Sequence, residues 1–561
     1  MSLKVVIIGG VAGGASAAAR LRRLDETAEI VLFEKDKYIS FANCGLPYYI
    51  GDVIEERGDL LVQTPERMRE RFNIDVRVRS EVIRILPDEK KVEVRNFKNG
   101  ESYLESYDKL ILSPGAVPHV PPVKGVDHPR VFTIRNVPDT DAVKGFVETN
   151  KPERAVVIGA GFIGMEMAEN LYKKGVKVTI IELSENIIPM LDFEMAALAE
   201  RYVIDKGIEV IRGTTATTLD RNGELLVVEL INGRRIETDM VVFGIGVRPE
   251  ATLAKESGLA IGQSGGIAVD EYLLTSDANI YAIGDAIEVT NLVSGTPALI
   301  PLAGPANKQG RIAADNVCGR QRKYKTTQGT AILKIFDMAV ASTGLNERGL
   351  MRAGIAYQTA ICHPFSHATY FPGASMLSVK VLFDAQDGTL LGAQVVGEDS
   401  VDKIIDAFSM AVRAGMTVFD LTELEFAYAP PFSSAKSPVN MAGYVASNIL
   451  SGDVAVATWR DVDNIDPDHV AILDVRTSYE HKHDGNIKGA LHIPVDDLRA
   501  RMHELPKDKE IYVYCRVGMR AYIACRILKQ NGYNVRNISG GFITYKAAHD
   551  VLAVGQKVAV S

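Results

Sequence analysis

Cys44 has the clearest chemical potential in the first half of the chain. It lies in the segment Ser40 to Pro47, SFANCGLP, where serine, glycine and proline favour an exposed turn at the start of a helix. Backbone N–H groups at a helix start favour the thiolate form of a nearby cysteine, so we expect a lowered pKa and a reactive thiol at Cys44. The alternative is a buried, inert cysteine.

A second candidate nucleophile, Cys515, follows the apolar run Ile511 to Tyr514 and begins a loop that leads into a helical stretch. If the backbone amides of this loop face the sulfur, they stabilise a thiolate or a persulfide anion. Cys525 lies well inside the following helix and is expected to be in the core. The predicted loop residues are Arg516, Val517, Gly518, Met519 and Arg520, of which the two arginines add positive charge.

Composition and charge exclude several function classes. The five cysteines include no close-spaced pair, which favours neither a disulfide framework nor a zinc site, so no metal is predicted. The formal net charge of −8 argues against a nucleic-acid partner. Because no export signal opens the sequence and no apolar run reaches the roughly 20 residues of a membrane span, we expect a cytoplasmic protein without a membrane partner.

A glycine-rich loop stands ahead of Cys44 in the sequence. The β-branched run Lys4 to Ile8 leads into the cluster GGVAGG and then into a helix, and a second strand ends at Glu34, 20 residues beyond Gly14. This pattern predicts a dinucleotide site, although Val11 replaces the middle glycine of the usual fingerprint. The residues predicted to bind this cofactor are Gly9, Gly13, Gly14, Glu34 and Lys35.

The same pattern returns between residues 154 and 182. A strand is followed by the loop GAGFIG, a helix through Tyr172 and a strand that leads to a carboxylate. Two such units in one chain predict two dinucleotide sites, the alternative being two doubly wound domains that bind nothing. The predicted residues of the second site are Gly159, Gly161, Phe162, Ile163, Gly164 and Glu182.

A third segment, residues 275–285, reads as a short strand that delivers Asp285. Together with the two loops, it makes residues 1–445 resemble the flavoprotein disulfide reductases with two dinucleotide-binding domains. The resemblance implies FAD on the first site, with Gly284, Asp285 and Ala303 among its contacts, and a nicotinamide cofactor on the second. Glu182 would repel a 2′-phosphate, which favours NADH over NADPH. The family's third region implies a dimerisation domain.

The segment around Cys44 has no second cysteine, unlike that of glutathione-reductase-type enzymes. Oxidase and peroxidase relatives place a histidine in the first glycine loop, where this chain has Ala12. SFANCGLPYYIG and the later segment AYAPPFS instead resemble coenzyme A-disulfide reductases. That resemblance implies a homodimer in which Tyr428 and Tyr370 serve the cysteine of the partner subunit. For each tyrosine the alternative is a purely structural aromatic.

Arg20 and Arg23 are one turn apart on the first helix and share a face that suits phosphates, whereas Arg22 points elsewhere. The alternative is a solvated helix face. The resemblance implies that coenzyme A binds here, at Ala12, Arg20, Arg23, Ser40 and Asn43. It also implies that Phe162 gates the flavin, the alternative being a wall of the NAD pocket that does not move. Glu166 is implied to approach the flavin edge, although the lysine that usually partners this glutamate is not evident.

From about Trp459 the chain resembles a rhodanese domain, with Asn486 and Ala521 as departures from the usual pattern. A sulfur-carrying domain joined to a reductase of S–S bonds favours NADH-dependent reduction of coenzyme A persulfide or related small-thiol persulfides. The alternatives are a coenzyme A-disulfide or polysulfide reductase, an NADH oxidase or peroxidase, and a persulfide carrier or sensor.

The predicted fold class is α/β: two Rossmann-like domains for FAD and NAD, an α+β dimerisation domain and a C-terminal α/β rhodanese domain. A chain of 561 residues is long enough for several such cores. The predicted boundaries are residues 1–150 and 246–325 for the FAD domain, 151–245 for the NAD domain, 326–448 for the dimerisation domain, 449–458 for a linker and 459–561 for the rhodanese domain.

Overall fold

The computed structural model describes residues 2–560, which divide into two compact units. The first comprises residues 1–181 and 215–329, and the second comprises residues 182–214 and 330–561. Within the described residues, no helix is long and apolar enough to cross a membrane, and no group of side chains is arranged to hold a metal ion.

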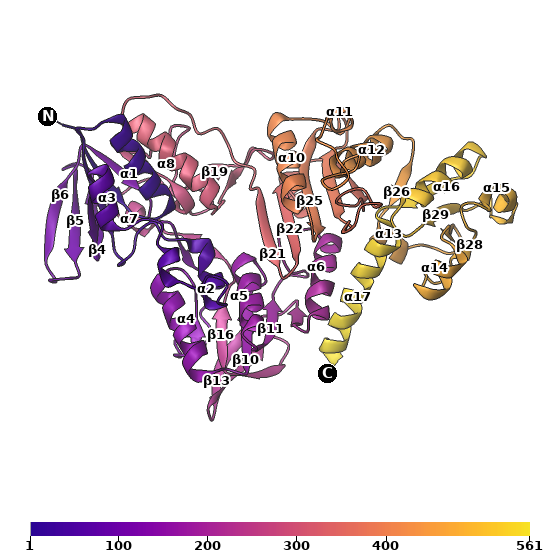
Figure 1. Cartoon of the computed structure of the whole chain (residues 1–561), viewed down its shortest axis with the longest axis horizontal. Helices are drawn as coiled ribbons and strands as arrows, with labels where there is room; N and C mark the ends of the chain where they lie inside the picture. Colours follow the sequence, from indigo (N-terminus) through magenta and orange to yellow (C-terminus); the bar gives the residue numbers. More distant parts are fainter. Residues whose placement is uncertain (1, 561) are drawn as a thin grey trace. The chain divides into compact units, whose positions relative to one another are not determined.

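The first unit contains a parallel sheet in the order β18-β7-β1-β2-β3. The strands β1, β2, β7 and β18 have largely apolar, buried cores, as expected of a parallel sheet covered on both faces, whereas the edge strand β3 alternates charged and apolar residues. Helices α1 and α8 pack side by side on this sheet (Figure 1). The bounds are β1 (Lys4–Ile8), β2 (Glu29–Glu34), β3 (Asp75–Val78), β7 (Lys109–Leu112), β18 (Ile280–Ala282), α1 (Ala12–Leu24) and α8 (Ala303–Val317).

Smaller elements surround this sheet. An antiparallel sheet is formed by β4 (Ser80–Leu86), β5 (Lys91–Asn96) and β6 (Ser102–Ser106), and short pairs by β8 (Ala116–Pro118) with β17 (Val247–Pro249) and β19 (Val289–Thr290) with β20 (Pro297–Ala298). The helices and 3₁₀ turns are η1 (Asn43–Gly45), α2 (Leu46–Ile50), η2 (Arg57–Leu60), α3 (Pro65–Phe72), α7 (Thr252–Glu256) and η3 (Gly284–Ala286).

A second parallel arrangement in the first unit repeats the design of the first. In it β10 (Arg154–Ile158) lies between β11 (Lys177–Glu182) and β16 (Met240–Phe243), which in turn pairs with β9 (Val131–Phe132). The remaining elements are α4 (Val137–Asn150), α5 (Phe162–Lys173) and the antiparallel strands β13 (Ala216–Asn222), β14 (Leu225–Leu230) and β15 (Arg235–Thr238).

The second unit contains an antiparallel sheet in the order β21-β22-β25-β24-β23. The helix α10 packs on β22 and β25, and its apolar residues recur at a helical period. The bounds are β21 (Ala331–Ile335), β22 (Met338–Gly344), β23 (Tyr357–Cys362), β24 (Ser378–Asp384), β25 (Leu390–Gly397), α9 (Glu347–Ala353), α10 (Val401–Ala414), α11 (Asp420–Glu423) and α12 (Pro438–Leu450).

The C-terminal part of the second unit is a parallel sheet in the order β26-β30-β29-β27-β28. The bounds are β26 (Ala455–Ala457), β27 (Val470–Asp474), β28 (Leu491–His492), β29 (Glu510–Tyr514), β30 (Val535–Ile538), α13 (Trp459–Asp463), α14 (Ser478–His483), α15 (Leu498–Arg501), η4 (Met502–Glu504), α16 (Met519–Gln530) and α17 (Gly541–Val560).

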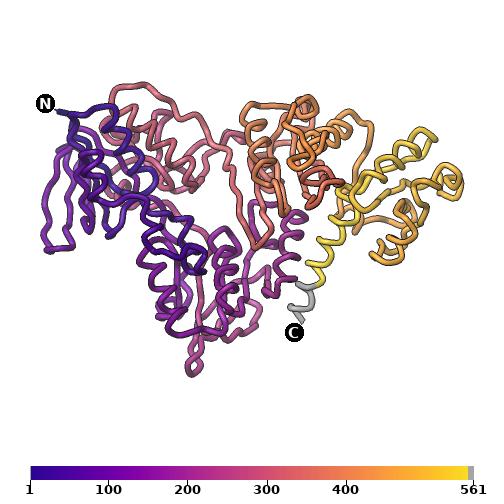
Figure 2. The backbone as a smooth tube through the Cα atoms, viewed as in Figure 1, coloured from indigo at the N-terminus to yellow at the C-terminus, as the bar shows by residue number. Residues whose placement is uncertain are grey.

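Residues 449–458, predicted as a linker, contain β26, the edge strand of the C-terminal sheet. Residues 182–214 carry α6 (Phe193–Asp205) and β12 (Glu209–Arg212) and cluster with the second unit. The predicted boundaries of the NAD domain stay a prediction. Figure 2 shows the first part of α17 running alongside α6. Trp459 of α13 stacks on Phe193 of α6, with 5.3 Å between the ring centroids, inside a small cluster of buried apolar side chains.

Candidate functional site

The first glycine loop brings β1 and α1 into very close approach. A Cβ on Gly14 would lie 1.9 Å from the Gly9 carbonyl oxygen, and one on Gly9, whose φ is +94°, would lie 2.1 Å from the Ser113 carbonyl oxygen. Both positions therefore require glycine. Val11 has a negative φ of −95°, so a side chain is tolerated where the fingerprint usually has glycine.

Glu34 ends β2 and is held by the loop beside it. Its Oε2 accepts a hydrogen bond from the Gly10 N–H at 2.9 Å, and its Oε1 accepts one from the Asp36 N–H at 3.0 Å. Burial raises the pKa of this carboxyl although both hydrogen bonds oppose the shift. The carboxylate thus stands at the carboxyl edge of the sheet, where a ribose hydroxyl would meet it.

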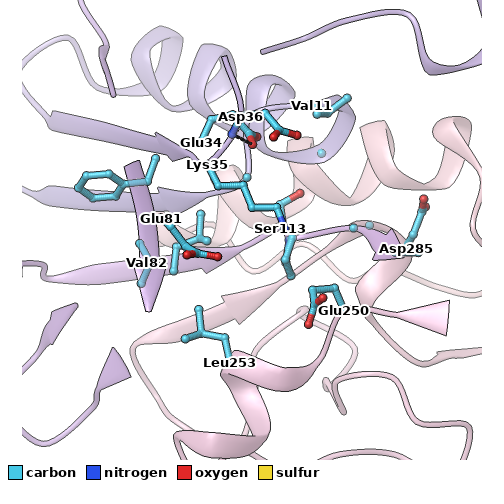
Figure 3. Close-up of a pocket in the computed structure, with 18 of the residues that line it drawn as sticks. Val11, Glu34, Lys35, Asp36, Glu81, Val82, Ser113, Glu250, Leu253 and Asp285 are labelled. Carbon is cyan, nitrogen blue, oxygen red and sulfur yellow. Dashed lines mark hydrogen bonds between the residues drawn. The ribbon is translucent and has the colours of Figure 1, made fainter. Parts of the chain in front are cut away.

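A cavity of about 440 Å³ opens at this edge (Figure 3). Its polar lining includes several groups that the sequence did not single out: Glu81, Ser113, Arg135, Asn136 and Glu250. Ser113 directly follows β7, so the rule that ligands bind at the carboxyl ends of parallel strands could have identified it. The predicted residues that line the cavity are Gly9, Ala12, Gly13, Glu34, Lys35, Asn43, Gly284 and Asp285.

These residues fit a dinucleotide. The glycine cradle leaves the N-terminus of α1 open to a phosphate, and Glu34 and Asp285 offer acceptors for hydroxyl groups. Burial raises the pKa of Asp285, which lies on η3. Ala303 is the first residue of α8 and is not among the lining residues, whereas Ala306, one turn further along, is.

Cys44 lies in η1, and its side chain is exposed. The prediction of a lowered pKa is wrong: partial burial of the thiol raises the pKa of Cys44, and the carboxylates of Glu166 and Asp285 raise it further. The helix that follows, α2, is only five residues long and has Pro47 in its first turn, which removes one N–H group. Desolvation and negative charge therefore outweigh the helix start.

Tyr48 faces Glu166, a contact between distant residues that the sequence does not indicate. The Tyr48 hydroxyl donates to Glu166 Oε1 at 3.3 Å. Burial raises the pKa of Glu166 to about 7, and burial and the neighbouring carboxylates raise the pKa of Tyr48. A carboxyl group that titrates near neutral pH thus lies close enough to Cys44 to influence its ionisation.

We expect Glu166→Gln to increase the reactivity of Cys44. Removing a negative charge favours the thiolate, so the pKa of Cys44 should fall by up to about one unit and alkylation by iodoacetamide should accelerate about threefold to tenfold at pH 8. Alkylation is measured on the NADH-reduced protein under anaerobic conditions, with the exposed Glu56→Gln as the control.

The pH profile distinguishes this effect from a general loosening of the site. Because Glu166 is largely protonated below its pKa of about 7, the rates of the variant and the wild type should converge as the pH falls below 6. A difference that persists unchanged at pH 5 would contradict an electrostatic origin.

A second cavity, of about 340 Å³, lies beside α1 and α8. Arg20, Arg23 and Ser40 line it, together with Ser16, Gln63, Asn307 and Arg311. Arg20 is paired with Asp315 Oδ1 through Nε at 2.9 Å and Nη2 at 2.7 Å, so Arg23 and Arg311, whose side chains are exposed, are the more available cations. The predicted coenzyme A residues are therefore divided between the two cavities: Arg20, Arg23 and Ser40 line the second, and Ala12 and Asn43 line the first.

Arg22 points away from this cavity, as predicted. It is 4% exposed, and its guanidinium donates to five backbone carbonyl oxygens, those of Asp25, Glu26, Ala28, Phe72 and Asn73. Arg22 thus fastens the end of α1 to α3 and to the start of β2, and its charge is directed into the protein.

The second glycine loop repeats the geometry of the first. A Cβ on Gly164 would lie 1.9 Å from the Gly159 carbonyl oxygen, the same approach that Gly14 makes to Gly9. A Cβ on Gly161 would meet only the Gly244 carbonyl oxygen, at 3.9 Å, which leaves room for a phosphate. Phe162 and Ile163 begin α5, where both are half-buried, and Glu182 is the buried last residue of β11.

Tyr370 and Tyr428 lie together in the second unit. Their hydroxyl groups are 2.9 Å apart, and the residues are 74% and 49% exposed. The structure thus pairs two tyrosines that are 58 positions apart in the sequence. Large exposed aromatic side chains with polar tips are typical of binding surfaces.

Cys515 is fully buried between β29 and α16. The Gly518 N–H donates to Cys515 Sγ at 3.1 Å, and Gly518 has a φ of +97° that turns the loop. Arg520 forms a two-pronged ion pair with Glu480, at 2.7 and 2.6 Å, which lowers the pKa of Glu480 to about 2. Arg516 is exposed. Cys525 is buried in α16, as predicted, and burial raises its pKa.

The chain contains two nucleotide-binding folds with glycine loops and an antiparallel domain, which together define a flavoprotein reductase. The cysteine loop on the C-terminal parallel sheet adds a sulfur-transfer fold. Residues 3–310 match the pyridine nucleotide-disulphide oxidoreductase family, residues 330–438 match its dimerisation domain, and residues 461–548 match the rhodanese-like domain. The chain belongs to the pyridine nucleotide-disulphide oxidoreductase family and carries a C-terminal rhodanese-like domain.

Several relatives refine this assignment. The reduced CoADR-RHD of Bacillus anthracis is 49% identical, with a TM-score of 0.95 over 98% of this chain and 99% of that one. An NAD-dependent persulfide reductase from A. fulgidus is 37% identical, with a TM-score of 0.91 over 97% and 100%. The coenzyme A disulfide reductase of Staphylococcus haemolyticus is 37% identical over 80% of this chain and 100% of its own length. The chain is thus an oxidoreductase of a family whose cofactors are FAD and NAD(H).

Proposed function

We propose that this protein uses NADH to reduce the S–S bond of coenzyme A persulfide or a related small-thiol persulfide at Cys44. The observation that carries the proposal is the position of Cys44, which is exposed and follows closely on Asn43, a lining residue of the dinucleotide cavity. No second cysteine stands near Cys44 in the sequence, so the oxidised form must be a mixed disulfide or a sulfenic acid.

The overall reaction is R–S–SH + NADH + H⁺ → R–SH + H₂S + NAD⁺. The Cys44 thiolate attacks the carbon-linked sulfur of the persulfide, the S–S bond breaks and HS⁻ leaves, which forms the mixed disulfide Cys44–S–S–R. Two electrons, which FAD relays from NADH when it is bound, then cleave this disulfide and return the Cys44 thiolate and R–SH. A coenzyme A disulfide would react by the same steps with a thiolate as the leaving group, and the names of the staphylococcal relatives favour it as the second candidate.

We assign the arginine-lined cavity to the nucleotide end of coenzyme A. Arg23 and Arg311 are exposed cations at its rim, and Ser40, four residues before Cys44, connects this cavity with the reactive thiol. The pantetheine arm would then reach from the arginines past Ser40 and Asn43 to Cys44.

We assign proton donation to Tyr428 and Tyr370 of the partner subunit in a homodimer. Either hydroxyl of the pair can be the donor of the hydrogen bond that joins them, and this bond raises the pKa of Tyr370. The Tyr428 hydroxyl would then give its proton to the leaving thiolate.

NADH should exceed NADPH in kcat/KM by at least about tenfold. The buried Glu182 at the end of β11 would meet the 2′-phosphate of NADPH, and a like-charge contact readily costs about 1.4 kcal/mol. Steady-state kinetics with both cofactors measure the ratio, and Glu182→Gln should narrow it. Equal use of the two cofactors by the wild type would refute this role of Glu182.

The proposed function is tested by anaerobic NADH consumption with four oxidants in parallel: coenzyme A persulfide, coenzyme A disulfide, polysulfide and hydrogen peroxide. We expect the highest kcat/KM with the persulfide. The oxidase alternative is represented by the water-forming NADH oxidase of Lactobacillus brevis, which is 27% identical with a TM-score of 0.77 over 81% of this chain and 100% of that one. Preferred turnover of peroxide, or of oxygen in an aerobic control, would overturn the proposal.

A further inference from the structure

The loop that holds Cys515 is supported from behind by the first residues of α17. The Phe542 N–H donates to the Cys515 carbonyl oxygen at 2.8 Å, and the Ile543 N–H donates to the Arg516 carbonyl oxygen at 3.1 Å. In a trans peptide the C=O and the next N–H point in opposite directions. With these two carbonyl groups fixed toward α17, the N–H groups of Arg516 and Val517 point to the opposite side of the loop, away from α17.

Gly541 makes this support possible. Its φ is +61°, and a Cβ there would lie 2.6 Å from the Cys515 carbonyl oxygen and 2.9 Å from the Gly518 nitrogen. The same Gly518 N–H donates to Cys515 Sγ at 3.1 Å. The turn at Gly540 and Gly541 therefore sits directly against the peptide groups that determine how the loop faces the sulfur.

This turn is held in place by a histidine from a different domain. His363 directly follows β23 of the dimerisation domain and is 7% exposed. Its Nε2 lies 3.0 Å from the Gly540 carbonyl oxygen and 3.0 Å from Thr544 Oγ1, and its Nδ1 lies 2.9 Å from Ser378 Oγ. Because a carbonyl oxygen can only accept, Nε2 carries the proton and donates to Gly540, and the Ser378 hydroxyl donates to Nδ1.

We propose that His363 is a positioning residue for the Cys515 site: the dimerisation domain, through His363 and the Gly540 carbonyl, fixes the turn that orients the sulfur-binding loop of the rhodanese-like domain. The side chain is buried, hydrogen-bonded at both ring nitrogens and about 150 residues away from Cys515 in the sequence. The rhodanese-like domain would thus depend on its neighbour for the geometry of its anion-stabilising loop.

The test uses the full-length, FAD-loaded protein and the pH dependence of Cys515 alkylation by iodoacetamide, quantified by mass spectrometry of the Cys515 peptide. A looser loop also changes how easily the reagent reaches the buried sulfur, which alters the plateau rate of alkylation. The pH at which the rate is half its plateau is therefore the diagnostic quantity. His363→Leu should raise this pH by about one unit. At any fixed pH well below it, the fraction of Cys515 that reacts should then be about tenfold smaller than in the wild type.

Two further variants separate positioning from simple disruption. His363→Gln keeps an N–H donor for the Gly540 carbonyl and should restore the wild-type profile. His367→Leu removes another buried histidine from the same segment, one that bonds to Ser366 and the Pro372 carbonyl, and should also leave the profile unchanged. NADH-dependent reduction at Cys44 should persist in all three variants, which reports on folding.

Other charged groups do not complicate the readout. Burial lowers the pKa of His363 to about 4, so it stays neutral across the assay. Arg520, paired with Glu480, is the charged group that faces Cys515, and the buried Cys525 lies on the same helix as Arg520. The three variants leave Arg520, Glu480 and Cys525 unaltered.

The proposal is overturned if the pH profile of His363→Leu equals that of the wild type. It is also overturned if His363→Gln or His367→Leu shifts the profile as far as His363→Leu does. The inference rests on Cys515 being the reactive thiol of the rhodanese-like domain. Because alkylation reports the thiolate and not sulfur transfer, a chain that fails to transfer sulfur but shows the predicted shifts would refute only the proposed sulfur chemistry.

Discussion

Cys44→Ser should abolish NADH-dependent reduction of coenzyme A persulfide, by at least about a thousandfold in kcat, while sulfur transfer through Cys515 continues. A serine hydroxyl in this position cannot form the mixed disulfide through which electrons reach the substrate, and the removal of a covalent nucleophile has effects of this order or larger. Both activities are measured on the same FAD-loaded preparation, with sulfur transfer followed from thiosulfate to an acceptor thiol.

Cys515→Ser is the matched variant and should give the opposite pattern. A small persulfide can diffuse directly to the exposed Cys44, so its reduction should continue, and only substrates that must first load sulfur on Cys515, such as protein-borne persulfides, should be lost. If Cys515→Ser destroys turnover of free coenzyme A persulfide while the protein stays folded and FAD-loaded, the two sites are steps of one obligatory path.

Tyr428→Phe should slow release of the thiol product by roughly a hundredfold and leave flavin reduction by NADH intact. Loss of a positioned proton donor typically has an effect of this size, because the leaving thiolate must then be expelled unprotonated or take its proton from water. Stopped-flow absorbance separates the two half-reactions. Tyr370→Phe should have a smaller effect, since its hydroxyl acts through Tyr428, to which it lies at 2.9 Å.

Tyr444→Phe is the control for this prediction, because Tyr444 is a partly exposed tyrosine on α12 in the same unit. The proposed role is wrong if Tyr428→Phe slows flavin reduction by NADH as much as it slows thiol release. A role in trans adds a further expectation: mixing Tyr428→Phe with Cys44→Ser should produce heterodimers in which one site pairs an intact Cys44 with an intact Tyr428.

Local sequence rules sufficed for the parts of the fold that depend on short-range geometry. The spacing from Gly14 to Glu34 reflects one strand, one tight turn and one helix, so the strand and helix of the first loop follow directly from the pattern. The predicted fold class is confirmed, and so is the rhodanese-like domain after Trp459.

Features that depend on long-range packing did not follow from these rules. The stacking of Trp459 on Phe193 joins two residues that are 266 positions apart. The pKa of Cys44 was predicted in the wrong direction because it is raised first by burial of the thiol and then by Glu166 and Asp285, and both effects come from the packing of distant segments. The pairing of Arg20 with Asp315 likewise joins α1 to a helix almost 300 residues away, which no helical spacing indicates.

The central claim is that Cys44 takes up the thiol part of a persulfide and releases sulfide, and one measurement tests it most directly. The NADH-reduced protein, freed of excess NADH under anaerobic conditions, is mixed with one equivalent of coenzyme A persulfide, and the cysteine peptides and free sulfide are quantified. We expect a coenzyme A adduct on Cys44, none on Cys515, and one sulfide released for each adduct. A sulfenic acid on Cys44, or an adduct confined to Cys515, would contradict the mechanism.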